Sequence, residues 1–348
     1  MKKKESSILL RYAEFCTGIG GFRKGIEKSK LNAICVYKNE KSLECEKTYQ
    51  YNFRESFDSH DIFDISEKTI PDIDMLCAGF PCQSFSIAGK QKGFNDSRGT
   101  VFFKLESIIK EKMPRIVFLE NVPNLKTHDN GKTFSIIKKS FENIGYNFFY
   151  DILNSAYFGI PQKRPRLFIV ALRKDIAVNH FCFTKDNGKR AVLKDILIRD
   201  NHINMDTNVS DKWQTYIDLY TGKIDINDID FELPKTRIRL ERKSENANLK
   251  DCIFQIRSSG IRAYSLDEQY PTFAVSVSGG GAMIPVLSKQ RRHLSVNEIK
   301  LLMGFPKDYD FPSNVSKTNQ IKQLSNAVCP PVIESIANDI YNSIFYYS

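Results

Sequence analysis

A cysteine at position 82 stands where a side chain could do chemistry. It lies in the stretch GFPCQSFS (79–86), just after the apolar run 73–78, which predicts a strand. A cysteine kept for packing would be expected inside such a run, as Cys77 is. Cys82 instead follows the run, where the chain leaves a sheet and side chains can reach a ligand. Because a thiolate is a strong nucleophile, Cys82 is the candidate for covalent catalysis.

An acidic residue follows another predicted strand, at 115–119. No histidine adjoins Cys82 as a general base, so the thiol needs a lowered pKa or a substrate that takes up charge as it is attacked. Glu120 would lie on the same sheet edge, because the carboxyl ends of parallel strands meet there. Cys82 could then attack C6 of a pyrimidine while Glu120 hydrogen-bonds N3 and supplies a proton, which makes C5 nucleophilic.

Two arginines precede the predicted strand 166–172. Arg164 and Arg166 are two residues apart in the run QKRPR, so they project on one side if this segment is extended. Guanidinium groups there would suit a phosphate or a carbonyl oxygen. The alternative is a basic pair on the surface.

A glycine-rich turn, GIGG (18–21), separates a predicted strand from a predicted helix. Such a turn lets backbone N–H groups approach a ligand, although a tight structural turn is the alternative. Glu40, just past the second predicted strand, is placed to bind ribose hydroxyls. Asp61 and Ile62 would add an acceptor and an apolar contact to a nucleoside pocket. The alternatives are a solvated Glu40 and a helix-capping Asp61.

These candidates fall on a regular alternation of strands and helices in the first half of the chain. Such alternation implies βαβ units and therefore an α/β fold with a mostly parallel sheet. The predicted strands are 8–15, 33–37, 73–78, 115–119 and 166–172, and the predicted helices are 22–28, a segment that ends near 53, 101–110 and 133–143.

The alternation stops after about position 174. The region 175–290 is polar and irregular, with short β-like runs such as 272–277, and predicts a small second domain. Helical pattern returns with Ser295 as N-cap and Glu298 completing a capping box, and a last helix follows Pro330 and Pro331. We therefore expect a first domain over 1–174, a second over 175–290, and a segment 291–348 that returns to the first.

The composition is that of a globular chain with a basic charge balance. The 348 residues include 51 Lys and Arg against 41 Asp and Glu, a formal net charge of +10. This charge suits a polyanion such as nucleic acid, although a lysine-rich solvated surface gives the same number. The eight cysteines include no Cys-x-x-Cys pair, so we expect no zinc site, and free thiols in a reducing cytoplasm. No apolar run is long enough to cross a membrane.

The motifs, taken in order, resemble those of the C5-cytosine DNA methyltransferases, especially the compact bacterial enzymes of restriction–modification systems. The resemblance covers 12–172 and 292–340. The stretches that carry it are GIGGF (18–22), NE (39–40), DI (61–62), GFPCQ (79–83), RGTVFF (98–103), ENV (120–122), QKRPR (162–166), GFP (304–306) and QLSNAV (323–328).

The resemblance implies a Rossmann-like domain that methylates cytosine with S-adenosylmethionine. Cys82 would attack C6 of a flipped cytosine and Glu120 would contact N3 and the exocyclic amine. Arg164 and Arg166 would hold the base's carbonyl and organise the thiolate loop. The cofactor would contact Gly18, Ile19, Gly20, Gly21, Glu40, Asp61, Ile62, Pro81 and Asn326.

The resemblance also implies contacts with double-stranded DNA. The segment 84–98 would be the loop that closes on DNA, and 175–290 the target-recognition domain. The DNA-contacting residues would be Ser86, Lys90, Arg98, Arg262 and Thr272. A cognate restriction endonuclease would be a genetic partner, and we expect a monomer in a bacterial cytoplasm.

Three positions depart from the family's pattern. Cys16 replaces a phenylalanine, Lys41 a bulky apolar residue and Ser325 a glycine. Because the first two normally hold the adenine, we expect looser adenine packing and lower cofactor affinity.

Three rival functions fit parts of the sequence less well. An RNA cytosine methyltransferase is disfavoured by the large middle region, since major-groove readout needs such a module. A DNA-binding regulator without activity would be expected to lack Cys82 and Glu120. A nicotinamide oxidoreductase accounts for the glycine turn but not for the Pro-Cys-Gln turn.

Overall fold

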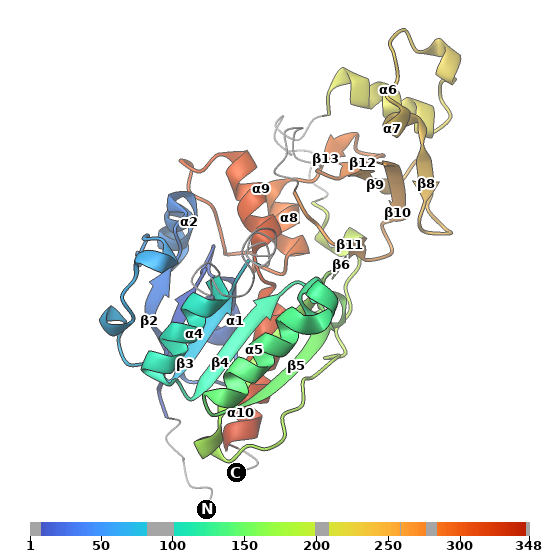
Figure 1. Cartoon of the computed structure of the whole chain (residues 1–348). Helices are drawn as coiled ribbons and strands as arrows, with labels where there is room; N and C mark the ends of the chain where they lie inside the picture. The colour runs from blue at the N-terminus through green and yellow to red at the C-terminus, as the bar shows by residue number, and fades with distance from the viewer. Residues whose placement is uncertain (1–7, 82–100, 199–208, 258, 276–283, 346–348) are drawn as a thin grey trace, which may run out of the picture.

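The alternating apolar runs of the first half form one sheet covered by helices on both faces (Figure 1). This computed structural model describes residues 8–81, 101–198, 209–257, 259–275 and 284–345. Neighbouring strands from β2 to β4 are parallel, and β7 is antiparallel to both of its neighbours, which confirms the predicted α/β class and mostly parallel sheet. Among these residues the spatial order is β2 (Ala33–Asn39), β1 (Leu10–Phe15), β3 (Met75–Gly79), β4 (Ile116–Asn121), β7 (Pro165–Arg173) and β5 (Tyr146–Asn154).

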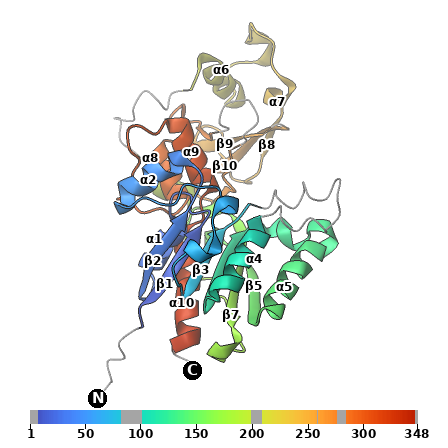
Figure 2. The ribbon, with the colours of Figure 1, turned by 60° about the vertical axis from the view of Figure 1, so that its left-hand side comes forward.

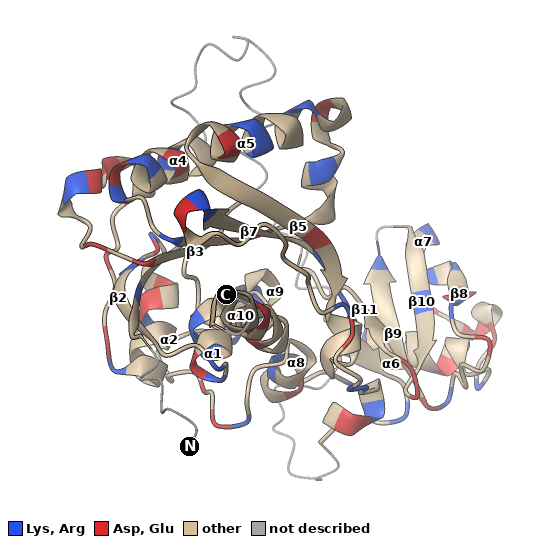
Figure 3. Ribbon diagram, turned by 90° about the horizontal axis from the view of Figure 1, so that it is seen from below, with Lys and Arg blue, Asp and Glu red and all other residues tan. Residues whose placement is uncertain are grey.

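Successive side chains of each central strand enter two separate hydrophobic cores, because strand residues alternate between faces. In β4, Val117 and Leu119 join one core, whereas Ile116 and Phe118 join the other. Figures 2 and 3 show the two helical layers on opposite sides of the sheet. The first core contains α4 (Val101–Lys112) and α5 (Lys132–Asn143), and the second contains α1 (Gly21–Glu27), α2 (Leu43–Phe53) and α10 (Pro330–Phe345).

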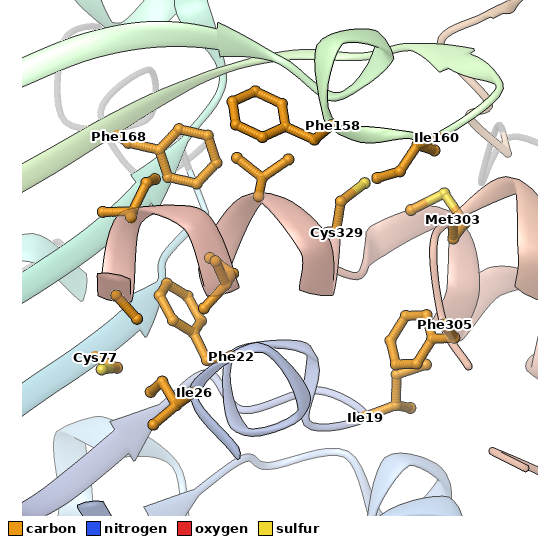
Figure 4. Close-up of a cluster of buried hydrophobic side chains, with 14 of the residues drawn as sticks. Ile19, Phe22, Ile26, Cys77, Phe158, Ile160, Phe168, Met303, Phe305 and Cys329 are labelled. Atoms are coloured by element: carbon orange, nitrogen blue, oxygen red, sulfur yellow. The ribbon is translucent and has the colours of Figure 1, made fainter. Parts of the chain in front are cut away.

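The C-terminal segment packs back onto the first domain. Figure 4 shows Phe22 of α1 beneath the helix α10, with Cys329 at the start of that helix and Phe305 beside Ile19. The capping box predicted at Ser295 is present, since Ser295 Oγ accepts from Glu298 N and Glu298 Oε2 accepts from Ser295 N. The helices of this segment are α8 (Val296–Leu302), α9 (Lys317–Asn326) and α10.

The middle region builds a second sheet with its own core. Helix α6 (Asp211–Tyr220) covers one face of it, with Tyr220 packed edge-on against Phe254. A short helix, α7 (Lys235–Ile238), precedes β8, and the two-residue strands β11 (Tyr270–Pro271) and β6 (Gln162–Lys163) pair this region with the first domain. The spatial order is β13 (Arg292–His293), β12 (Val286–Leu287), β9 (Cys252–Arg257), β10 (Gly260–Ser265) and β8 (Leu240–Arg242). No helix in the described ranges is long and apolar enough to cross a membrane.

The β-like run predicted at 272–277 is wrong over the residues that the structure describes, 272–275, which form no strand. The backbone N–H of Phe273 donates to the side chain of Gln162, and the Thr272 hydroxyl donates to the carbonyl of Lys163. These bonds attach the segment to the first domain in place of a strand partner. Sequence analysis also missed the strand β5 and the helices α6 and α9.

Candidate active site at the ends of β3 and β4

Glu120 occupies the carboxyl end of β4, next to Gly79 of β3 in the sheet register. Its Oε1 atom lies 3.1 Å from Nε of Arg166, which projects from the neighbouring strand β7. Burial raises the pKa of Glu120, and the positive charges of Arg166 and Arg164 oppose that rise without cancelling it. This carboxyl group therefore holds its proton to a higher pH than an exposed glutamate does.

The chain that leads from β3 towards Cys82 is fixed by its buried neighbours. Asn121, which follows Glu120, donates from Nδ2 to the carbonyl of Phe80 over 2.9 Å and accepts from Val122 N over 2.8 Å. The Phe80 ring packs against Phe102 of α4. Sequence analysis gave Asn121 no role, although it stands inside the ENV motif.

Pro81 is exposed at the end of this segment, and Cys82, Ser86, Lys90 and Arg98 lie outside the described residues.

Arg164 and Arg166 have different surroundings. Arg164 is 3% exposed, and its guanidinium donates to the carbonyls of Phe273 (2.9 Å), Ser325 (2.8 Å) and Ala327 (3.1 Å). Burial, with repulsion from Arg166, lowers the pKa of Arg164 to about 10. Arg164 thus ties β7 to the second domain and to the C-terminal segment, while Arg166 is the arginine paired with Glu120.

Gln162 makes a second link between the same three parts of the chain. It is fully buried, and its Nε2 donates to the carbonyl of Leu302 over 2.8 Å while its Oε1 accepts from Phe273 N over 2.7 Å. Its place in the run QKRPR was the only sequence signal for this role. Through Gln162 and Arg164, the segment at Phe273 is fixed beside the candidate active site.

The glycine turn between β1 and α1 forms a backbone cradle. Gly18 N donates to Glu40 Oε2 over 3.2 Å, so Glu40 stands at the end of β2 beside the turn. Gly20 has φ +77°, and a Cβ atom there would lie 2.5 Å from the ring of Phe53, so only glycine fits. A Cβ atom on Gly18 would meet no described atom within 4 Å, so the turn borders open space.

Val328 connects the glycine turn with the end of β3. A Cβ atom on Gly21 would lie 2.7 Å from Val328, and one on Gly79 would lie 3.5 Å from it. The same idealised Cβ of Gly79 would lie 3.6 Å from Glu120 Oε2. Asn326, two residues before Val328, is exposed at the end of α9. The structure therefore brings the turn, Glu120 and the Asn326 segment together.

Asp61 and Ile62 begin a short 3-10 helix, Ile62–Asp64. Asp61 caps it, accepting from Phe63 N over 3.3 Å, and Ile62 is buried. Lys41 forms an ion pair with Asp61, with Nζ 3.2 Å from Oδ2. The capping role weighed as an alternative is thus present, and a lysine occupies one carboxylate oxygen of the predicted adenine pocket.

Two predicted DNA-contacting residues belong to the second half of the chain. Thr272 lies at the first domain, since its hydroxyl donates to the carbonyl of Lys163 over 2.9 Å. Arg262 lies on β10 of the second sheet, with Nε 3.5 Å from Glu241.

Comparison with known families identifies this arrangement. The family model described as C-5 cytosine-specific DNA methylase matches residues 10–342. The chain belongs to this family. Type II methyltransferase M.HhaI of Haemophilus parahaemolyticus is 35% identical over 339 residues, which cover 96% of this chain and 95% of that protein. Type II methyltransferase M.Bsp6I of a Bacillus species is 33% identical, covering 97% of this chain and 100% of that protein.

Solved structures share the fold of this cytosine methylase. The S. pombe Dnmt2 methyltransferase superposes with a TM-score of 0.68 at 18% identity, covering 97% of this chain and 100% of that one. The Entamoeba histolytica methyltransferase EhMeth gives 0.66 at 19% identity, covering 96% and 98%. The chain is therefore a DNA (cytosine-5-)-methyltransferase with the fold of its family.

Proposed function

We propose that this methyltransferase transfers a methyl group from S-adenosylmethionine to C5 of a cytosine flipped out of a short, specific duplex site. The observation that carries the proposal is the Glu120–Arg166 pair at the end of β4, beside the turn that leads to Cys82. A largely buried carboxyl group with a raised pKa and a partly buried guanidinium beside it suit a pyrimidine that must be protonated at N3 and held at its carbonyl.

The base-side chemistry follows from these residues. Cys82, directly after Pro81, attacks C6 as the thiolate while Glu120 gives its proton to N3, so the ring becomes an enamine that is nucleophilic at C5. After C5 has taken the methyl group, the C5 proton passes to water and the Cys82 sulfur leaves as thiolate, which restores the 5,6 double bond, and N3 returns its proton to Glu120. We assign Arg166 to the base's carbonyl, and Arg164, whose terminal nitrogens donate to protein carbonyls, to organising the loop of Cys82.

The residues that we assign to the cofactor suit a nucleoside with a charged substituent. The open space at Gly18 is bordered by the carboxylates of Glu40 and of the capped Asp61, which are two acceptors, with Ile62 as apolar wall. The bound cofactor supplies an electrophilic methyl group on its sulfonium. The residues that we assign to it are Gly18, Ile19, Gly20, Gly21, Glu40, Asp61, Ile62, Pro81 and Asn326.

Duplex DNA is the proposed substrate, and the second domain its reader. We assign Arg262 and Thr272 to DNA contacts, together with Ser86, Lys90 and Arg98, which lie outside the described residues. The division into 1–174, 175–290 and 291–348 then separates catalysis, target recognition and the returning segment. By analogy with its Type II relatives, we propose a restriction–modification role with a cognate endonuclease as genetic partner, carried out by a monomer in a bacterial cytoplasm.

Trapping the covalent intermediate tests this function. A duplex with 5-fluorocytosine at the target position, found beforehand by bisulfite sequencing, should form an adduct on Cys82 in the presence of S-adenosylmethionine, because fluorine cannot leave C5 as a proton does. Cys82→Ser should abolish methyl transfer and keep specific DNA binding, while Cys182→Ser, at an exposed cysteine, should leave both unchanged. Turnover by Cys82→Ser, or preference for RNA over DNA oligonucleotides in competition, would contradict the assignment.

A further inference from the structure

Glu241, on strand β8 of the second sheet, is surrounded by three positive side chains. Its Oε1 lies 2.8 Å from Nη2 of Arg239, and its Oε2 lies 2.8 Å from Nζ of Lys243 and 3.5 Å from Nε of Arg262. All four side chains keep contact with solvent, since the exposed fractions are 26% for Glu241, 29% for Arg262 and larger for the other two. One carboxylate thus meets three cations, and the cluster keeps a net positive charge.

The strand register places Glu241 and Arg262 side by side on one face of the sheet. Glu241 pairs with Arg262 of β10, which in turn pairs with Gln255 of β9, and residues directly opposite each other in a sheet project to the same side. The next residues, Ala263 and Phe254, belong to the core under α6. Glu241, Arg262 and Gln255 therefore lie on the face that α6 does not cover.

This face continues to the catalytic end of the molecule. The ring of Tyr264, two residues after Arg262, packs against Tyr270, and the Tyr264 hydroxyl lies 3.4 Å from Gln255 Oε1. Tyr270 belongs to β11, which pairs with Gln162 of β6, two residues before Arg164. A cavity of about 160 Å³ lies on this side, lined by Gln255, Tyr270, Thr272 and their neighbours. The charged cluster thus shares a continuous surface with the proposed DNA contact Thr272.

The guanidinium of Arg262 forms an ion pair with Glu241, and Nε is its nearest atom. Nε lies 3.5 Å from Glu241, and within the described ranges neither terminal nitrogen of Arg262 donates a hydrogen bond. Guanine is read in the major groove by two parallel donors from one arginine to O6 and N7. An arginine that pairs with a carboxylate on its Nε side, and whose Nη atoms donate no hydrogen bond within the described residues, keeps the donors that this contact needs.

We propose that Glu241 is a positioning residue that sets base specificity at one G·C pair, by holding Arg262 at Nε so that both Nη atoms face guanine. Arg239 pairs with Oε1 of Glu241, and Lys243 shares Oε2 with Arg262, so both help to keep Glu241 in place. This inference rests on the proposed function, because it takes the ligand to be the target duplex.

Discrimination between duplexes tests the inference. The wild-type protein, Glu241→Gln and Glu245→Gln are assayed for kcat/KM on the cognate duplex and on a panel in which each G·C pair is replaced in turn. Glu245 is an exposed carboxylate outside the cluster, so it controls for loss of one negative charge. We expect Glu241→Gln to lower the discrimination at one G·C pair by about tenfold or more, and Glu245→Gln to leave it unchanged.

A double-mutant cycle shows whether Glu241 acts through Arg262. Arg262→Ala should lose discrimination at the same pair, and Glu241→Gln should cause no further loss in that background. Unchanged discrimination in Glu241→Gln, or an equal change on every duplex, would overturn the inference. If the wild-type protein transferred no methyl group, the proposed function would fail instead, and the same panel read by fluorescence anisotropy would still decide the role of Glu241.

Discussion

The hydroxyl of Tyr309 donates a hydrogen bond of 2.7 Å to the backbone carbonyl of Ile19, across a sequence separation of 290 residues. The Tyr309 side chain is almost fully buried, and its ring packs against Phe305 and Phe53. The carbonyl of Ile19 lies inside the glycine turn, so the C-terminal segment holds the loop that we assign to the cofactor. This contact links the C-terminal segment directly to the glycine turn.

Replacing Tyr309 by phenylalanine should weaken cofactor binding. The change keeps the ring and removes the donor, so a buried carbonyl loses its partner at a cost of about 1–3 kcal/mol. Part of that cost should appear as a several-fold higher Kd for S-adenosylmethionine, because the turn loses its fixed position. Isothermal titration measures this, with Tyr341→Phe on α10 as the matched control. An unchanged Kd in Tyr309→Phe would show that the turn holds its shape without this bond.

Replacing Lys41 by leucine should strengthen cofactor binding. Lys41 pairs with Asp61, and both side chains are exposed, so the pair itself adds only about 0.2–1 kcal/mol. Its removal frees a carboxylate oxygen for the adenine and adds an apolar neighbour, so we expect a Kd for S-adenosylmethionine about threefold lower. Lys47→Leu on α2, which also removes a lysine from an ion pair, is the control. Tighter binding by both variants would point to net charge rather than to the adenine pocket.

The pH dependence of methyl transfer should report Glu120. Burial raises its pKa, so the protonated form that can serve N3 persists above the pH at which an exposed glutamate has ionised. We expect kcat to fall as the pH rises through that value. Glu120→Gln should lower kcat by roughly 10²–10⁴-fold and remove this limb of the profile, since an amide neither titrates nor transfers a proton. If kcat of Glu120→Gln fell over the same pH range as kcat of the wild type, the titrating group would be another residue.

The order of elements could be predicted because it depends on local patterns. The alternation of apolar runs and helical periods gave the α/β sheet, and the capping box at Ser295 is encoded within four residues. Strand β5 was missed, because its run YNFFYDILN mixes polar and apolar residues at the sheet edge, where one side is half-exposed. Local pattern therefore predicted the centre of the sheet better than its edge.

The environment of Arg164 could not be predicted, because it depends on tertiary packing. Its spacing from Arg166 suggested one joint role on an extended segment, and the structure places the two guanidiniums in different surroundings. The carbonyls that bind Arg164 come from Phe273, Ser325 and Ala327, between 109 and 163 residues further along the chain. No pattern within QKRPR distinguishes an arginine that binds protein carbonyls from one that pairs with Glu120.

Because of Glu14, the free energy of unfolding of the protein should fall as the pH rises. It is the last residue but one of β1, fully buried, and neither carboxyl oxygen has a hydrogen-bond partner among the described residues. Burial raises its pKa from 4.5 to about 8, against a lowering by Arg23. The pKa of Glu14 is therefore higher in the folded protein than in the unfolded chain. Its contribution to the free energy of unfolding is fully present below pH 4.5 and is lost as the pH rises through 8. Between these two pKa values, the free energy of unfolding should fall by up to roughly 1.4 kcal/mol per pH unit.

Glu14→Gln removes this titration while keeping the size of the side chain. Urea unfolding at a series of pH values from 5 to about 9 should therefore give a free energy of unfolding that falls less steeply with pH in the variant than in the wild type. Glu111→Gln, at an exposed position on α4, should follow the wild-type curve. Parallel curves for Glu14→Gln and the wild type would mean that Glu14 ionises in the folded state with an ordinary pKa, through a polar partner or water that reaches its carboxyl group.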